Sequence, residues 1–118
     1  MGLTLTALGN LFRRRFTQRY PKVKPKVPAD LRGKLYHDRG KCIYCGLCAK
    51  YCPSGAITVD VQKKTWSHDL GKCLFCGQCE ETCRLLPKKN AIKMSPEFEL
   101  AMISKHGMVR THEKPPAS

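Results

Sequence analysis

Eight cysteines stand in two runs with the same spacing, and they are the residues of this chain best suited to chemistry. Each run reads C-x2-C-x2-C-x3-C, and the 118-residue chain has no cysteine outside the two runs. The first run contains Cys42, Cys45, Cys48 and Cys52, and the second contains Cys73, Cys76, Cys79 and Cys83. Thiolates at such spacings bind soft metal ions or iron–sulfur clusters.

Two other uses of cysteine fit this pattern less well. A disulfide framework needs an oxidising compartment, and we find no export signal in the sequence. Zinc is usually held by two cysteine pairs that a loop separates, which together build one tetrahedron. Each run here offers three ligands in one tight turn and a fourth just beyond, which suits the corners of a cubane. We therefore predict two 4Fe–4S clusters with all eight cysteines as ligands, and a zinc-binding module remains the alternative.

The two runs resemble those of two-cluster bacterial ferredoxins. In that family the fourth cysteine of a run ligates the cluster of the other run. The resemblance implies that Cys42, Cys45, Cys48 and Cys83 hold one cluster, and that Cys73, Cys76, Cys79 and Cys52 hold the other. We expect each fourth cysteine at the start of a short helix. Pro53 follows Cys52 as the family pattern requires, but Arg84 stands where the second proline is usual.

The repeat extends beyond the cysteines. The segment 37–42 matches 68–73 almost residue for residue, and Gly46 and Gly77 hold equivalent places in the loops. Each copy predicts a short strand, a cysteine loop, a short helical turn and a second strand. The predicted strands are Leu35-Tyr36, Ile57–Val59, Thr65-Trp66 and Ile92–Met94, with a turn at Lys63-Lys64. The predicted fold class is α+β, a pseudo-twofold two-cluster bacterial-type ferredoxin domain over residues 34–95. We take the repeated His37 and His68 as structural.

Residues 96–118 follow this domain. Ser95-Pro96 reads as an N-cap and a first helical residue, which predicts a short C-terminal helix over Glu97–Lys105. The remainder, from Thr111 to Ser118, contains two consecutive prolines and is expected to be an extended, mobile tail.

Residues 1–33 are expected to form a separate basic N-terminal arm. Lys and Arg number 22 against nine Asp and Glu, a net charge of +13, and many of the basic residues lie here among prolines. Leu5, Leu8, Phe12 and Phe16 would share one face of an amphipathic helix. That face could contact a membrane surface, a groove on a partner, or the protein's own core. No apolar run is long enough to span a bilayer, and we expect no binding of nucleic acid.

With this arm included, the chain resembles the two-cluster ferredoxin-like subunit of respiratory complex I. Related subunits occur in energy-converting NiFe hydrogenases, formate hydrogenlyase and archaeal sulfane reductases. The resemblance spans about residues 3–105 and rests on Thr17–Pro21, Pro28, Arg32-Gly33, Asp38, Lys41–Ile43 and Cys48.

This resemblance implies an electron-transfer subunit that lies peripherally on the cytoplasmic side of the cell membrane. Its partners would be the other subunits of a multisubunit membrane complex, among them a 4Fe–4S small subunit and a catalytic subunit. Soluble ferredoxin is a further expected partner, as electron donor. The chain shows no nucleophile–base pair and no phosphate-binding glycine loop, so we assign it no catalytic residues of its own. The alternative function is that of a free soluble dicluster ferredoxin, which would have no use for residues 1–33.

Overall fold

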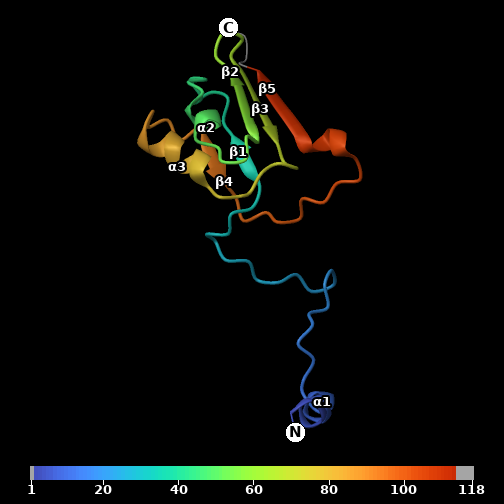
Figure 1. Cartoon of the computed structure of the whole chain (residues 1–118). Helices are drawn as coiled ribbons and strands as arrows, with labels where there is room; N and C mark the ends of the chain where they lie inside the picture. Colours follow the sequence, from blue (N-terminus) through green and yellow to red (C-terminus); the bar gives the residue numbers. More distant parts are fainter. Residues whose placement is uncertain (1, 114–118) are drawn as a thin grey trace.

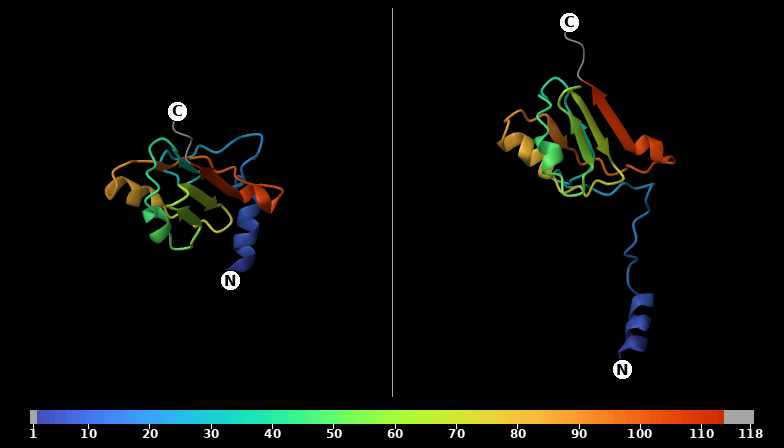
Figure 2. Two further views of the ribbon diagram at one scale, coloured as in Figure 1. Left: turned by 90° about the horizontal axis from the view of Figure 1, so that it is seen from above. Right: turned by 45° about the horizontal axis from the view of Figure 1, so that its top comes forward.

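A computed structural model describes residues 2–113 and divides them between an N-terminal arm and a compact body (Figure 1). Helix α1 (Leu3–Leu11) stands away from the body, and residues 12–33 join the two without helix or strand. Figure 1 and the right-hand view of Figure 2 both show this separation. The molecule is therefore elongated, with extents of 69 × 28 × 23 Å.

Five strands form two small antiparallel sheets in the body. Strand β1 (Leu35–His37) pairs with β4 (Ile92–Met94), so the first strand of one copy pairs with the second strand of the other. Strands β2 (Ile57–Asp60), β3 (Thr65–Asp69) and β5 (Val109–Glu113) form the second sheet, with β3 in the middle. The four strands predicted from the sequence are confirmed, and so is the turn at Lys63-Lys64.

Two helices pack against each other on one side of this body, opposite β5 (Figures 1 and 2). Helix α2 (Leu47–Lys50) begins after Gly46, and α3 (Gln78–Leu85) begins after Gly77. Both glycines have left-handed φ angles, 76° and 78°. A left-handed residue reverses the chain at little cost only where it is glycine. Each helix therefore starts between the second and third cysteines of its run.

The predicted place of the fourth cysteine was wrong in both copies. Cys52 lies two residues after the end of α2, and Cys83 lies in the last turns of α3. The physical reason is the early helix start at the glycine, which leaves Cys52 beyond the end of α2 and Cys83 in the last turn of α3.

The predicted helix over Glu97–Lys105 was also wrong. Residues 97–104 contain no helix, and a 3₁₀ helix, η1 (Lys105–Met108), follows instead. The start of this segment instead forms backbone hydrogen bonds with the end of the arm. Gly33 N–H donates to Ser95 O and Lys34 N–H donates to Glu97 O, both at 2.9 Å. The carbonyls that a first helical turn would use are thereby engaged elsewhere.

The expected C-terminal tail is only partly within the described residues. Residues 111–113 belong to β5, in which His112 lies opposite Trp66 in the register. Residues 114–118 lie outside the described residues. The sheet of β2 and β3 therefore contains a third strand, β5, which the internal repeat did not predict.

The core lies between the sheets and the helices. Its largest fully buried side chains are Trp66 and Tyr44, each 2 % exposed, and three cysteines, Cys48, Cys79 and Cys83, belong to the same buried cluster. With so few large apolar side chains, the space around the cysteines forms a substantial part of the interior.

The arm differs from its prediction in one respect. Helix α1 ends at Leu11, so Phe12 is its C-cap and Phe16 lies outside the helix. None of its residues is buried, and Leu5 and Leu8 are about three-fifths exposed, at 64 % and 58 %. The structure therefore does not pack this face on the protein's own core. In residues 2–113 no helix has the length and apolar character to cross a membrane.

Candidate cluster sites

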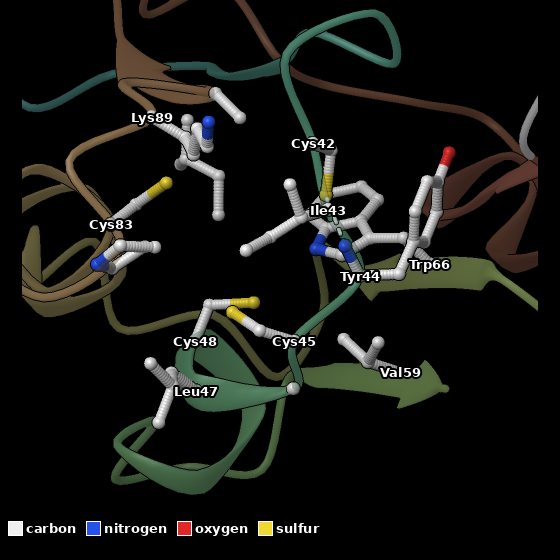
Figure 3. A pocket seen from close by; sticks show the side chains of 14 residues that line it. Cys42, Ile43, Tyr44, Cys45, Leu47, Cys48, Val59, Trp66, Cys83 and Lys89 are labelled. Atoms are coloured by element: carbon white, nitrogen blue, oxygen red, sulfur yellow. Dashed lines mark hydrogen bonds between the residues drawn. The ribbon is translucent and has the colours of Figure 1, made fainter. Parts of the chain in front are cut away.

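The first cavity gathers four thiols from both cysteine runs. It is lined by Cys42, Cys45 and Cys48 of the first run and by Cys83 of the second. Figure 3 shows the four sulfurs around one space, with Cys83 entering from α3 on the side opposite Trp66. The empty space measures about 370 Å³. The structure thus brings a residue of the second run into the loop of the first.

A second cavity has the complementary composition. It is lined by Cys73, Cys76 and Cys79 of the second run and by Cys52 of the first, around about 320 Å³. The two cavities are similar in size and have the same number of thiols, as two sites for the same group should be. The eight predicted site residues are therefore divided into two quartets that exchange their fourth members.

The pseudo-twofold repeat also governs the cavity walls. Trp66 of β3 lines the first cavity, and Leu35, its counterpart in the repeat, lines the second. The Ala-Ile pairs after the fourth cysteines follow the same rule: Ala91-Ile92 line the first cavity and Ala56-Ile57 line the second. Each cavity is therefore walled by both copies, and neither copy could form one alone.

The cysteine loops curl tightly around their own sulfurs. Tyr44 and Phe75, at equivalent positions, have left-handed φ angles of 55° and 52°, which is uncommon for bulky residues. This turn brings Tyr44 N–H to 3.4 Å from Cys42 Sγ. The Phe75 N–H acts in the same way on Cys73 and lowers its pKa, although burial raises that pKa by more. Amide donors aimed at sulfur are a means by which proteins stabilise thiolate-bound clusters.

The most buried thiols resist ionisation in the absence of a metal. Burial raises the pKa of Cys48 to about 11 and that of Cys79 to about 12. Cys52 behaves differently: burial raises its pKa, but the Ser54 hydroxyl and neighbouring backbone N–H groups outweigh this and leave the pKa below its ordinary value. Because thiolates are the ligands, metal binding at Cys48 and Cys79 must displace protons.

The donor set fits a cluster better than a single ion. All eight cysteines are free thiols, and no three His, Cys, Asp or Glu side chains within residues 2–113 gather as ligands of one metal ion. Four thiols around a mostly apolar space instead suit a group with several metal atoms, each of which takes one cysteine. Cys42, Cys45, Cys48 and Cys83 could hold one such group, and the second quartet could hold another.

Trp66 is a wall residue that the sequence analysis placed only in a strand. Its indole lies close enough to Cys48 to lower that pKa somewhat, although the two do not form a well-shaped hydrogen bond. Its buried Nε1 has no hydrogen-bond partner among residues 2–113, and a cluster sulfur would supply an acceptor. The signal for this role was present, because Trp66 is the only tryptophan and is the repeat counterpart of Leu35.

Comparisons with known proteins agree with this geometry. A family model described as a 4Fe-4S dicluster domain matches residues 23–85. Subunit I 2 of the NADH-quinone oxidoreductase of Geobacter metallireducens is 33 % identical over 121 residues, which cover 96 % of this chain and 92 % of that protein. Formate hydrogenlyase subunit 6 of Escherichia coli is 39 % identical over 94 residues, 80 % of this chain and 52 % of that protein.

A solved structure shares the fold. A chain of the membrane-bound sulfane sulfur reductase, described as an archaeal respiratory membrane complex, superimposes with a TM-score of 0.66. The match covers 92 % of this chain and 58 % of that chain, at 22 % sequence identity. The two four-thiol cavities agree with the family model and with a relative that matches nearly the whole length of the chain. The chain therefore belongs to the 4Fe–4S dicluster family, in the group of NADH-quinone oxidoreductase subunit I, and binds two 4Fe–4S clusters.

Proposed function

We propose that this protein is an electron-transfer subunit of a membrane-associated respiratory complex of the hydrogenase, sulfane reductase or complex I type. The observation that carries the proposal is the pair of four-thiol cavities within one small domain. Bound 4Fe–4S clusters supply one-electron redox chemistry, and two of them in one domain provide a relay. The relatives named above support placement in a multisubunit complex, because their names identify them as subunits.

The ligand assignment is part of this proposal. Cys42, Cys45, Cys48 and Cys83 bind one cluster, and Cys73, Cys76, Cys79 and Cys52 bind the other. Support comes from the lining of each cavity. The pKa values agree: burial and, to a smaller extent, the charge of Cys83 raise the pKa of Cys42, and burial and the charge of Cys52 raise that of Cys73. The exchange ties the two copies together, so that binding of either cluster stabilises the whole domain.

The remaining residues provide surroundings rather than bond chemistry. Tyr44 and Trp66 are almost fully buried and keep water away from the first cavity. Backbone N–H groups of the loops hold negative charge on the sulfurs. Electron transfer requires only this positioning and burial, which agrees with the absence of a recognisable catalytic arrangement in the sequence.

We assign docking to residues 1–33, with the cluster domain at 34–95 and a C-terminal part at 96–118. The arm contacts the body at Glu99, where Tyr20 Oη donates to Glu99 Oε1 at 2.6 Å and Lys24 Nζ pairs with Glu99 Oε2 at 2.9 Å. It is also held at its C-terminal end, where Gly33 N–H donates to Ser95 O at 2.9 Å. N-terminal to Tyr20, the apolar residues of α1 and the basic residues Arg13–Arg15 are exposed. Such a helix suits a membrane surface or an acidic, apolar groove on a partner subunit.

We propose that the protein lies peripherally, on the cytoplasmic side of the membrane. Its neighbours are a 4Fe–4S small subunit and a catalytic subunit, and soluble ferredoxin is a candidate donor. Isolation of the tagged chain from native membranes, followed by mass spectrometry of the co-purifying proteins, tests the proposal. We expect both neighbouring subunits in stoichiometric yield. Recovery of the chain alone, in the membrane-free fraction, would return it to the class of free dicluster ferredoxins.

A further inference from the structure

Arg32 places a cation directly against the loop of the second cavity. Its Nη1 donates to the carbonyl oxygen of Cys76 at 2.8 Å. Its side chain also lies over Gly77: a Cβ at that glycine would be 3.4 Å from Arg32 Nε and 3.7 Å from Cζ. The guanidinium therefore contacts two consecutive residues of the loop that carries Cys76.

The backbone next to Arg32 is held in place. Gly33 N–H donates to Ser95 O and Lys34 N–H donates to Glu97 O, both at 2.9 Å. A Cβ on Gly33 would lie only 2.6 Å from Ser95 O, so no other residue fits there without a shift of the backbone. Arg32 thus projects from a segment fixed to the body, although its side chain is solvent-exposed.

The internal repeat supplies a matched comparison. Gly46 occupies the equivalent place in the first loop, and the side-chain atom nearest to its Cβ position is Cγ2 of Val61, at 3.7 Å. An apolar side chain thus covers the first loop where a cation covers the second. At this contact the two otherwise symmetrical sites differ in electrostatic potential.

Other charged groups share the surface around Arg32. A shallow depression is lined by Arg32, Gly77, Glu80, Glu81 and Arg84. Glu80 is partly engaged, because its Oε2 accepts from Met94 N–H at 3.0 Å. None of the ion pairs among residues 2–113 involves Arg32. The guanidinium is therefore not neutralised by direct pairing with either carboxylate within the described residues.

We propose that Arg32 raises the reduction potential of the cluster in the second cavity and thereby makes the two sites unequal. Reduction adds one negative charge to a cluster, and a nearby cation stabilises the reduced form more than the oxidised form. The effect rests on the proposed function only in that the Cys73–Cys79 loop must carry a cluster. The effect of Arg32 does not depend on which residue supplies the fourth ligand of that cluster.

The inequality gives the relay a preferred place for the electron. With its potential raised, the cluster of the second cavity holds an electron in preference to the first. Arg32 is a positioning and tuning residue, and it does not itself take part in electron transfer.

The test uses the full-length protein with both clusters bound, titrated potentiometrically and followed by electron paramagnetic resonance. Arg32→Gln should weaken reduction of one cluster by up to about tenfold in equilibrium constant, which is about 59 mV for a one-electron couple. Arg32→Lys should show a smaller shift, because the charge remains while the bond to Cys76 O is lost. Val61→Arg should raise the potential of the other cluster.

Iron and sulfide content is measured for every variant, so that loss of a cluster is not mistaken for a shift of potential. A lower potential in Arg32→Gln and a higher one in Val61→Arg, each at a different cluster, supports the proposal. An unchanged titration in Arg32→Gln, or equal shifts of both clusters, overturns it. If Arg32→Gln loses a cluster, Val61→Arg decides: a rise confined to one cluster supports the proposal, and no rise overturns it. These potentials are read in the isolated protein, so failure to join a complex would not affect the result.

Discussion

The imidazole of His37 lies flat on the indole of Trp66, with ring centroids 4.1 Å apart and planes 9° apart. His112 approaches from the neighbouring strand, and the Nδ1 atoms of His37 and His112 are 3.1 Å apart. These contacts connect β1, β3 and β5 directly behind the first cavity, which Trp66 lines. The structural role predicted for the repeated His37 agrees with this packing, and the partner His112 was not foreseen.

The stack should make stability depend on pH. Burial, and then the charge of His112, lower the pKa of His37 to about 4 from an ordinary value of 6.5. Folding therefore favours neutral His37. Its contribution to stability is present above pH 6.5 and is lost as the pH falls through 4. We expect the thermal unfolding temperature of the cluster-bound protein to fall between pH 7 and 5, and to fall less in His37→Phe.

The matched control is His106→Phe. His106 is exposed in η1, so this variant should follow the wild-type pH profile. Acid lability of the clusters is common to all three proteins and cancels in the comparison. Parallel profiles for wild type and His37→Phe would show that His37 is not the responsible group.

The exchange of fourth cysteines predicts effects in the opposite run. Cys83→Ser should damage the cluster bound by Cys42, Cys45 and Cys48, because Cys83 lines that cavity. Cys52→Ser should damage the other cluster. Paramagnetic resonance of the two variants should therefore retain different signals. Ser54→Ala serves as the control, since it removes only the Ser54 Oγ contact at 3.6 Å from Cys52 Sγ and should keep both clusters. The exchange would be refuted if Cys83→Ser lost only the cluster bound by Cys73, Cys76 and Cys79, or if Cys52→Ser lost only the cluster bound by Cys42, Cys45 and Cys48.

Close packing at Gly33 predicts a clear cost for Gly33→Ala. The added methyl group would meet the backbone oxygens of Ser95 and Glu97, and such overpacking typically costs about 1–3 kcal/mol. We expect a lower denaturation midpoint for the cluster-bound protein. Gly40→Ala is the matched control, because its nearest contact would be Asp38 Oδ1 at 3.4 Å. Equal midpoints for the two variants would mean that the pairing of residues 33–34 with 95–97 is not formed in solution.

The exposed face of α1 predicts that apolar contacts dominate docking. Burial of one leucine is worth about 1.5–3 kcal/mol, whereas an exposed charge pair contributes about 0–1 kcal/mol. Leu8→Asp should therefore reduce co-purification with membrane partners more than Arg14→Gln does. Both variants should keep two clusters, since α1 contacts neither cavity. Equal yields of complex from Leu8→Asp and wild type would remove α1 from the docking surface.

The sequence predicted those elements whose signals are local. Strands such as Ile57–Asp60 depend on residue type and on a pattern that occurs twice in the chain. The helix starts at Gly46 and Gly77 were not predicted, although the two glycines hold equivalent places in the repeat. The segment 97–104 could not be predicted in this way, because its conformation is fixed by Gly33 and Lys34, more than 60 residues earlier. The contact of Arg32 with Cys76 O depends on the same long-range pairing and was missed for the same reason.

Chemical analysis of anaerobically purified protein tests the central claim most directly. Two clusters with four irons each require about eight iron and eight sulfide ions per chain. After reduction, paramagnetic resonance should show two interacting 4Fe–4S centres that account for this iron. A single zinc ion per chain without sulfide would contradict the account of two clusters. So would a content of only four irons per chain that is lost completely in Cys83→Ser and also in Cys52→Ser, because both cysteines would then belong to one cluster.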